Sequence, residues 1–269
     1  MKVFVVSDME GVSGVVKWEQ VEGGEPLYEE ARKLYTEEIN AAVRGARAAG
    51  ATEILAMDCH GAGKGWTFNS LVPELLDPDC EWVVQDEWSE YTEFLEEGCD
   101  AALLVAMHAK AGSERGVMSH TISGRDYRDL RFNGVSVGET GINAALCGAW
   151  GCPAVLVTGD DVVCGEATDL LGAELVTAAV KKGLGRNSAR NLAPVHARAI
   201  IESAAKEAIE KHDRIPPYDP GQPCEVLAVL ATPDLAARYR FRQGVDLVDP
   251  VTVASRADDW WSAWRQFFF

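Results

Sequence analysis

Five short stretches of the chain consist almost entirely of apolar residues: 3–6, 54–57, 101–107, 154–157 and 226–230. Apolar and polar positions do not alternate within them, which is typical of parallel strands that are buried on both faces of a sheet. We therefore expect a mainly parallel central sheet that contains these five stretches.

Helical spacing of apolar positions separates the predicted strands. Residues 27–49 carry this pattern between the first two strands, and Gly50 can end the helix. Further helices are expected over residues 138–150 and 192–212. The order strand, helix, strand favours parallel βαβ units. The predicted fold is therefore α/β, a three-layer α/β/α domain with a mainly parallel central sheet.

The chain changes character after residue 193. Residues 213–223 include four prolines, which is typical of a loop or linker. A strand pair and a last helix over residues 257–268 are expected beyond it. We predict a metal-binding catalytic α/β domain over residues 1–193 and a smaller C-terminal α+β portion over residues 194–269. This portion would contribute to the substrate pocket, to oligomer contacts, or to both.

Six aromatic residues crowd the C-terminal end: Trp260, Trp261, Trp264, Phe267, Phe268 and Phe269. If they were exposed in a monomer, this apolar surface would promote association. The sequence leaves two alternatives open, because these residues can pack on the core of their own chain or build a contact between subunits.

Composition and charge exclude several classes of partner. The chain has 25 basic and 42 acidic residues and a net charge of -17, which repels phosphate backbones, so we expect no nucleic acid partner. No stretch approaches the roughly 20 apolar residues of a membrane span, and no signal peptide is recognisable, so we expect no membrane partner. Seven cysteines without a C-x-x-C pair favour reduced thiols and a cytoplasmic location.

Chemically active side chains follow four of the apolar stretches. They are Asp8 and Glu10, Asp58 and His60, His108, and Asp160 and Asp161. The carboxyl ends of parallel strands meet at one edge of a sheet, where ligands bind. Two acids spaced as Asp8 and Glu10 face the same side of extended backbone and repel each other unless a cation lies between them. Carboxylate oxygens with imidazole nitrogens suit Zn²⁺ at about 2.0–2.2 Å.

Simpler interpretations compete with a metal site. A single acid at a strand end is more often a turn or helix cap, and spacing alone leaves the two interpretations evenly open. His196 and His212 lie in a helical pattern among polar neighbours, and we interpret them as surface or packing residues. A thiol nucleophile at Cys59 is disfavoured, because adjacent residues in extended backbone point to opposite faces and His60 faces the proposed metal.

A series of motifs over roughly residues 1–195 makes the chain similar to the zinc D-aminopeptidases. In order, these motifs are Ser7-Asp8-Met9-Glu10-Gly11, Asp58 with His60, His108-Ala109, Gly116-Val117-Met118-Ser119-His120, Val137-Gly138-Glu139, Gly159-Asp160-Asp161 and Thr177-Ala178-Ala179-Val180-Lys181. The first motif alone would be weak evidence, whereas the whole series is specific. Beyond Pro194 the resemblance thins to scattered positions.

The resemblance implies two zinc ions per subunit. Asp8 would bridge both ions. Glu10 and His60 would complete one site, while the other would be completed by His108 and Glu139. Each zinc would then have three protein ligands and one open position, which is the pattern of catalytic rather than structural zinc. Taken without the resemblance, Glu139 would be an ordinary acid at a helix start.

The resemblance also makes His120 the candidate catalytic residue, as nucleophile or as acid–base group. We favour the acid–base role, because zinc itself activates water for attack and histidine titrates where proton transfer to a leaving amine requires it. A buried structural histidine is the alternative. Lys110 departs from the family pattern, in which arginine commonly follows the His-Ala pair, so the way a substrate carboxylate is held is open.

The function implied by the resemblance is an aminopeptidase that cleaves short peptides with a D-amino acid at the N-terminus. Two alternatives stay open. The divergent residues 194–269 favour a zinc amidohydrolase acting on a non-peptide amide, and a non-catalytic metal-binding protein would bind zinc without turnover. The family also implies a homo-oligomer, a closed ring such as a decamer with its sites facing an internal chamber. The sequence identifies no substrate-binding residue.

Overall fold

A central sheet of seven strands organises the protein, whose computed structural model describes residues 1–86 and 91–268. Its strands are β1 (Lys2–Ser7), β2 (Glu53–Asp58), β3 (Glu81–Val83), β4 (Ala101–Met107), β7 (Ala154–Asp160), β8 (Val176–Gly185) and β9 (Ser188–Asn191). They lie in the order β3-β2-β1-β4-β7-β8-β9, and only the β8–β9 pair is antiparallel. The four predicted strands at residues 3–6, 54–57, 101–107 and 154–157 all belong to this sheet.

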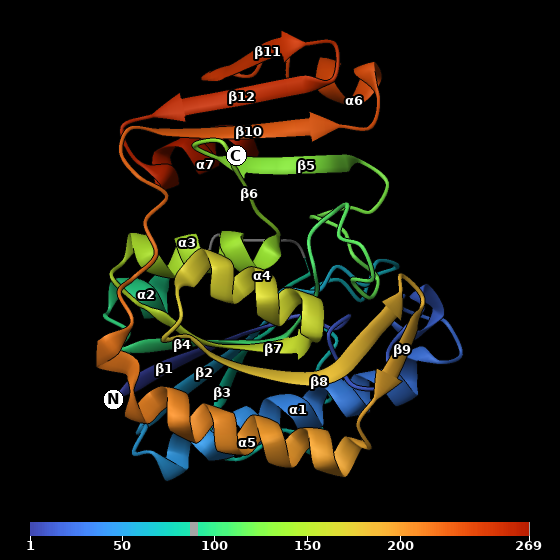
Figure 1. Ribbon diagram of the computed structural model, residues 1–269, viewed down its shortest axis with the longest axis vertical. Helices are drawn as coiled ribbons and strands as arrows, with labels where there is room; N and C mark the ends of the chain where they lie inside the picture. The colour runs from blue at the N-terminus through green and yellow to red at the C-terminus, as the bar shows by residue number, and fades with distance from the viewer. Residues whose placement is uncertain (87–90, 269) are drawn as a thin grey trace.

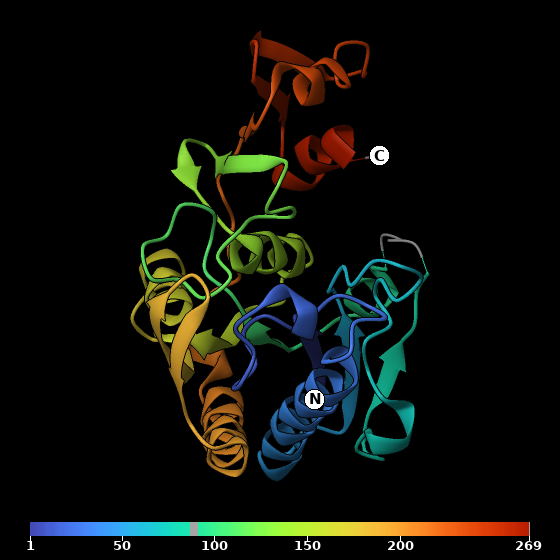
Figure 2. The same ribbon diagram turned by 90° about the vertical axis from the view of Figure 1, so that its right-hand side faces the viewer.

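Helices cover both faces of the central sheet. On one face, α1 (Tyr28–Ala48) and α5 (Pro194–Glu210) lie side by side, and α3 (Glu139–Ala149) and α4 (Asp161–Leu171) cover the other face (Figures 1 and 2). The chain also forms the short helices α2 (Glu93–Glu96) and α6 (Pro233–Ala237). The predicted three-layer α/β/α architecture with a mainly parallel sheet is therefore confirmed.

A second, antiparallel sheet lies beyond α3 and α4 (Figure 1). It contains β5 (Tyr127–Phe132), β6 (Val135–Ser136), β10 (Cys224–Leu230), β11 (Val245–Asp249) and β12 (Thr252–Ala257), in the order β11-β12-β10-β5-β6. The expectation of a parallel strand at residues 226–230 is wrong, because β10 pairs antiparallel with both neighbours. Its residues alternate between buried and half-buried, and apolar Leu227 and Val229 on the half-buried face conceal this alternation in the sequence.

The two sheets do not divide at residue 193. The β5–β6 hairpin precedes that residue yet belongs to the second sheet, whereas α5 follows it and packs against α1 and β8 of the central layer. The chain therefore crosses between the layers more than once. The roles predicted for residues 1–193 and 194–269 stay predictions.

The aromatic C-terminal end packs within its own chain. In helix α7 (Trp260–Phe268), the side chains of Trp260, Trp264 and Phe267 are buried, and the indoles of Trp260 and Trp264 contact the ring of Phe132. Helix α7 lies between the second sheet and α3. The side chain of Phe268 and the whole of Phe269 lie outside the described residues. For the described aromatic residues, packing on the core is the alternative that the structure supports.

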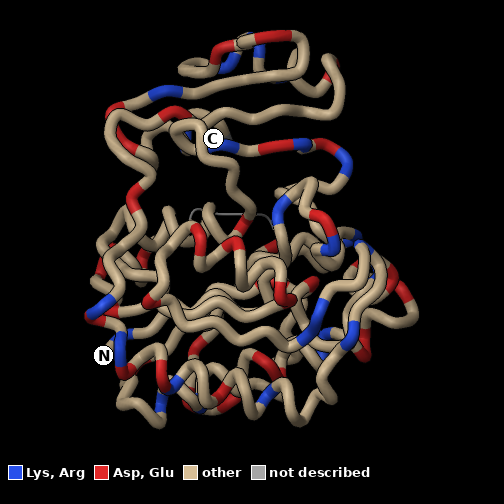
Figure 3. Tube along the Cα trace, viewed as in Figure 1, with Lys and Arg blue, Asp and Glu red and all other residues tan. Residues whose placement is uncertain are grey.

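Acidic and basic residues are interspersed along the whole trace (Figure 3). The excess negative charge is therefore spread over the fold and not confined to one element. Within the described parts of the chain, no helix combines the length and the apolar composition that crossing a membrane requires.

Candidate metal centre

The six residues predicted for the site come together at the carboxyl edge of the central sheet. Five of them line one cavity of about 900 Å³, and His108 lies directly behind them, fully buried. Three strands deliver four of the residues, because Asp8 and Glu10 follow β1, His60 follows β2 and His108 follows β4. Glu139 is the first residue of α3, and His120 lies in the loop that precedes β5.

The two oxygens of Asp8 face two different groups of side chains. Oδ1 of Asp8 lies 3.1 Å from Nδ1 of His60, and the same nitrogen lies 3.0 Å from Oε2 of Glu10. On the other side, Oδ2 of Asp8 lies 3.1 Å from Nε2 of His108, which is 3.2 Å from Oε1 of Glu139. Asp8 thus lies between two histidine–carboxylate pairs, as a carboxylate that bridges two cations would.

Backbone carbonyls orient both histidine rings. Nε2 of His60 lies 2.8 Å from the carbonyl oxygen of Val21, and Nδ1 of His108 lies 3.0 Å from that of Ala109. If these nitrogens donate to the carbonyls, the opposite ring nitrogens carry the lone pairs toward the carboxylates. Such an outer hydrogen bond is typical of histidines that bind metal.

Several polar atoms of this cluster lack a hydrogen-bond partner although they are buried. They are Oδ2 of Asp8, Oε2 of Glu10 and Nε2 of His108. Buried polar groups almost always have a partner, and oxygen and imidazole nitrogen are ligands that zinc prefers. The residues therefore fit metal ions. Ligand atoms of Asp8, Glu10 and His108 lie within 4.8 Å of one another, as do those of His108, His120 and Glu139, so the geometry also admits His120 as a ligand.

Burial and charge shift the pKa values of this cluster in opposite directions. Burial raises the pKa of Asp8, but the adjacent imidazoles of His108 and His60 outweigh it and hold that pKa well below its ordinary value. Burial lowers the pKa values of both histidines, but nearby negative charges outweigh it and raise both pKa values well above the ordinary value. These charges are Glu10 and Asp8 for His60, and Glu139 and Asp8 for His108. Protons and metal ions therefore compete for the same ring nitrogens.

The imidazole of His120 is held at the edge of the cluster. Its Nδ1 lies 2.8 Å from the carbonyl oxygen of Met118. Its ring stacks on that of His108, with 3.9 Å between the ring centroids, and the Trp18 ring packs edge-on against it, with 5.4 Å between the centroids. Nε2 lies 3.6 Å from Oε1 of Glu139. If Nδ1 donates to the Met118 carbonyl, Nε2 is available to exchange a proton within the cavity.

Tight backbone packing fixes the loops that carry these side chains. The N–H of Gly11 donates to the carbonyl oxygen of Ala106 at 2.8 Å, and a Cβ at Gly11 would lie 2.2 Å from the carbonyl oxygen of Met107. Only glycine permits this approach. The loop of His120 contains Ile122 at a φ of 62°, which is strained for a β-branched residue, and the N–H of Ile122 donates to Oε1 of Glu139 at 2.7 Å.

The other acids at strand ends have structural roles. Asp58 accepts hydrogen bonds from the hydroxyl group of Tyr35 and from the backbone N–H groups of Ser70 and His60. Asp160 accepts from the backbone N–H groups of Val162 and Val163 and so caps α4. Asp161 accepts from the N–H of Gly183. The fourth strand end therefore holds backbone in place and contributes no side chain to the cavity lining.

The remaining candidates from the sequence lie apart from the chemistry. His196 is exposed on α5, and His212 follows that helix with its Nδ1 2.9 Å from the carbonyl oxygen of Ile209. Cys59 lines the cavity, but burial raises the pKa of its thiol well above the ordinary value. Because the thiolate is the nucleophilic form, this environment disfavours a thiol mechanism.

Sequence reasoning missed the support that Lys181 gives to the site. Its buried Nζ donates to the carbonyl oxygens of Glu10, Val12 and Val15 at 2.5–2.9 Å, which fixes the loop that follows β1. Burial lowers the pKa of Lys181 to about 8. The sequence shows this residue only as part of the motif over residues 177–181, without indicating which loop it would hold.

We expect Glu38, which supports the same loop, to make stability fall as pH rises. Its Oε1 accepts from the N–H of Ser13 at 2.9 Å, and burial raises its pKa from 4.5 to about 7. Between these values the folded chain keeps a proton that the unfolded chain has released, so the free energy of unfolding decreases with pH. Glu38→Gln keeps the acceptor but cannot ionise. Urea unfolding measures the free energy of unfolding. Relative to the wild type, that of Glu38→Gln should increase by about 3 kcal/mol from pH 4 to pH 8.

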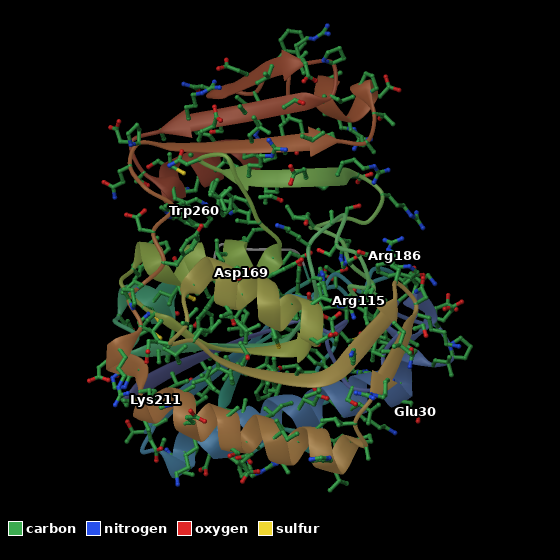
Figure 4. All side chains as sticks on the ribbon, in the orientation of Figure 1. Glu30, Arg115, Asp169, Arg186, Lys211 and Trp260 are labelled. Atoms are coloured by element: carbon green, nitrogen blue, oxygen red, sulfur yellow. The ribbon has the colours of Figure 1, made fainter. Side chains whose placement is uncertain are left out.

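Glu30→Gln provides the matched control for this experiment, because Glu30 lies on the exposed face of the same helix (Figure 4). Its stability should follow that of the wild type at every pH. If the free energies of unfolding of Glu38→Gln and of the wild type also change with pH in parallel, the assignment of a raised pKa to Glu38 is wrong.

Comparisons with known proteins identify the family of the chain. The sequence model of the D-aminopeptidase family matches residues 1–269. A D-aminopeptidase from Bacillus subtilis (strain 168) is 34% identical over 221 residues, which cover 82% of this chain and 78% of the relative. The solved structure of the Zn-dependent D-aminopeptidase DppA from Bacillus subtilis, described as a self-compartmentalizing protease, aligns with a TM-score of 0.91. That alignment has 29% identity and covers 99% of this chain and 95% of DppA. The chain therefore belongs to the D-aminopeptidase family.

Proposed function

We propose that the protein is a zinc-dependent aminopeptidase that removes an N-terminal D-amino acid from short peptides, using two zinc ions per subunit. The observation that carries this proposal is the position of Asp8, whose two oxygens face two separate histidine–carboxylate pairs. Glu10 and His60 would hold one zinc ion, and His108 and Glu139 would hold the other. Asp8 would contribute one oxygen to each.

The residues around the metal site have distinct roles in the proposed reaction. Bound zinc would polarise the scissile carbonyl group and activate the attacking water. His120 accepts at Nε2 the proton that the attacking water loses and delivers it to the leaving amine, because this nitrogen faces the cavity while Nδ1 lies against the Met118 carbonyl. Stacking on His108 and the edge contact with Trp18 keep the imidazole in place.

We further propose a homo-oligomer that closes into a ring, such as a decamer, and that works in the cytoplasm. The support for assembly is the description of the related DppA as self-compartmentalizing, and seven free cysteines fit a reducing compartment. A chamber would admit short peptides more readily than folded proteins. Light scattering that gives the mass of one chain would contradict the ring.

The substrate assignment is tested by following amine release from D-Ala-D-Ala and from L-Ala-L-Ala with zinc-loaded protein. We expect turnover of the D-dipeptide and a much slower reaction with the L-dipeptide. Equal rates would contradict the proposed chirality. Turnover of simple amides in preference to both dipeptides would favour the amidohydrolase alternative, and bound zinc without any turnover would favour a metal-binding protein.

A further inference from the structure

We propose that Arg186 binds the free α-carboxylate of the residue that leaves, which makes the enzyme selective for dipeptides. This inference rests on the proposed aminopeptidase function and adds a specificity residue to it. Neither the predicted metal ligands nor His120 explains how a substrate's C-terminal end is held.

Arg186 lies in the turn between β8 and β9, next to the loop that carries His120 (Figure 4). It lines the same cavity as His120 and Glu139. Its Nε lies 3.3 Å from the carbonyl oxygen of Ser119, within donating distance, and its guanidinium lies 5.7 Å from the centre of the Trp18 ring. Because Trp18 also contacts His120, one aromatic ring connects the guanidinium to the proposed proton donor.

The positive charge of Arg186 remains available for a ligand. Among the described residues, the groups that hold it are the carbonyl oxygen of Ser119 and the aromatic face of Trp18, which carry no net charge. By contrast, Lys64 at the cavity forms an ion pair with Glu25 at 2.6 Å. Lys110, at the position where the family commonly has arginine, donates from Nζ to the carbonyl oxygen of Ser136 at 3.1 Å and is not among the described residues that line the cavity.

The proposed role of His120 places the residue that leaves the substrate beside Arg186. Since His120 protonates the leaving amine, the residue that carries this amine must lie on the His120 side of the cavity. In a dipeptide this residue also bears the free carboxylate, whereas each additional residue moves the carboxylate away by up to about 3.3–3.6 Å.

The guanidinium of Arg186 stands at the His120 end of the cavity, where the carboxyl end of a dipeptide would lie. Guanidinium binds carboxylate with two parallel hydrogen bonds, which gives orientation as well as affinity.

The test compares D-Ala-D-Ala with its C-terminal amide, which keeps the scissile bond but lacks the negative charge. We expect the wild type to prefer the free acid. In Arg186→Gln, kcat/KM for the free acid should fall about 10- to 100-fold, mainly through KM, while kcat/KM for the amide stays unchanged. The preference for the free acid is thereby lost. Zinc content should equal that of the wild type, which excludes a folding defect.

Arg190→Gln is the matched control, because Arg190 is exposed on β9 of the same hairpin and is not among the described residues that line the cavity. It should retain the wild-type preference. Arg125 also lines the cavity. A preference that survives in Arg186→Gln but is lost in Arg125→Gln would assign the carboxylate to Arg125 and overturn the inference. A wild type that hydrolyses acid and amide equally well would overturn it too. If the wild type hydrolyses neither substrate, the proposed function itself is wrong, and the inference falls with it.

Discussion

Replacing Asp8 by alanine should remove zinc from both positions and lower kcat/KM for D-Ala-D-Ala by about 10⁴-fold or more. The reason is geometric, because each oxygen of Asp8 faces a different histidine–carboxylate pair. Without the bridge, each zinc would keep two protein ligands, fewer than the three that catalytic zinc sites usually have. Elemental analysis of the purified variant measures the zinc content, and a dipeptide assay measures the rate.

A control variant separates this effect from a general loss of acidic charge. Asp169 is exposed on α4 (Figure 4), so Asp169→Ala should retain both the zinc content and the rate of the wild type. If Asp8→Ala still binds one zinc per chain and keeps more than about a tenth of the wild-type rate, Asp8 is not the bridge on which catalysis depends.

Replacing His120 by alanine should lower kcat about 10²- to 10⁴-fold without changing the zinc content. This range is the usual contribution of a positioned acid–base group, and the metal ligands assigned here do not include His120. His196→Ala, an exposed histidine on α5, should behave as the wild type in both measurements.

Metal content decides between the two roles that the geometry admits for His120. A ring nitrogen of His120, a ring nitrogen of His108 and a carboxylate oxygen of Glu139 all lie within 4.8 Å of one another. If His120→Ala loses one zinc per chain, His120 is a metal ligand and the acid–base assignment is wrong. Retained zinc with an unchanged rate would make His120 a structural residue.

The central sheet could be predicted because its strands are buried on both faces. Continuous apolar stretches such as 101–107 and 154–157 reflect that environment directly. Strand β10 reads the same in sequence, but the apolar residues on its half-buried face hide its alternation. The β5–β6 hairpin could not be placed from the sequence, because its partner β10 follows it by almost a hundred residues. All three strands lie in the second sheet, outside the central layer.

The same physical distinction applies to the site. Asp8, Glu10, His60 and His108 follow strands of one parallel sheet, so chain order alone predicts that they meet. Glu139 begins a helix and His120 lies in a loop, and for these two the expectation came from the family motifs. The contacts of Lys181 and Arg186 join segments far apart in the chain. The sequence shows Lys181 only as part of the motif over residues 177–181, and it does not single out Arg186.

Anomalous X-ray scattering at the zinc absorption edge, from crystals of the zinc-loaded protein, tests the central claim most directly. We expect two peaks per chain about 3.5–4 Å apart. One should lie between Asp8, Glu10 and His60, and the other should lie between Asp8, His108 and Glu139. A single peak, or a peak about 2.0–2.1 Å from Nε2 of His120, would contradict the dinuclear site proposed here.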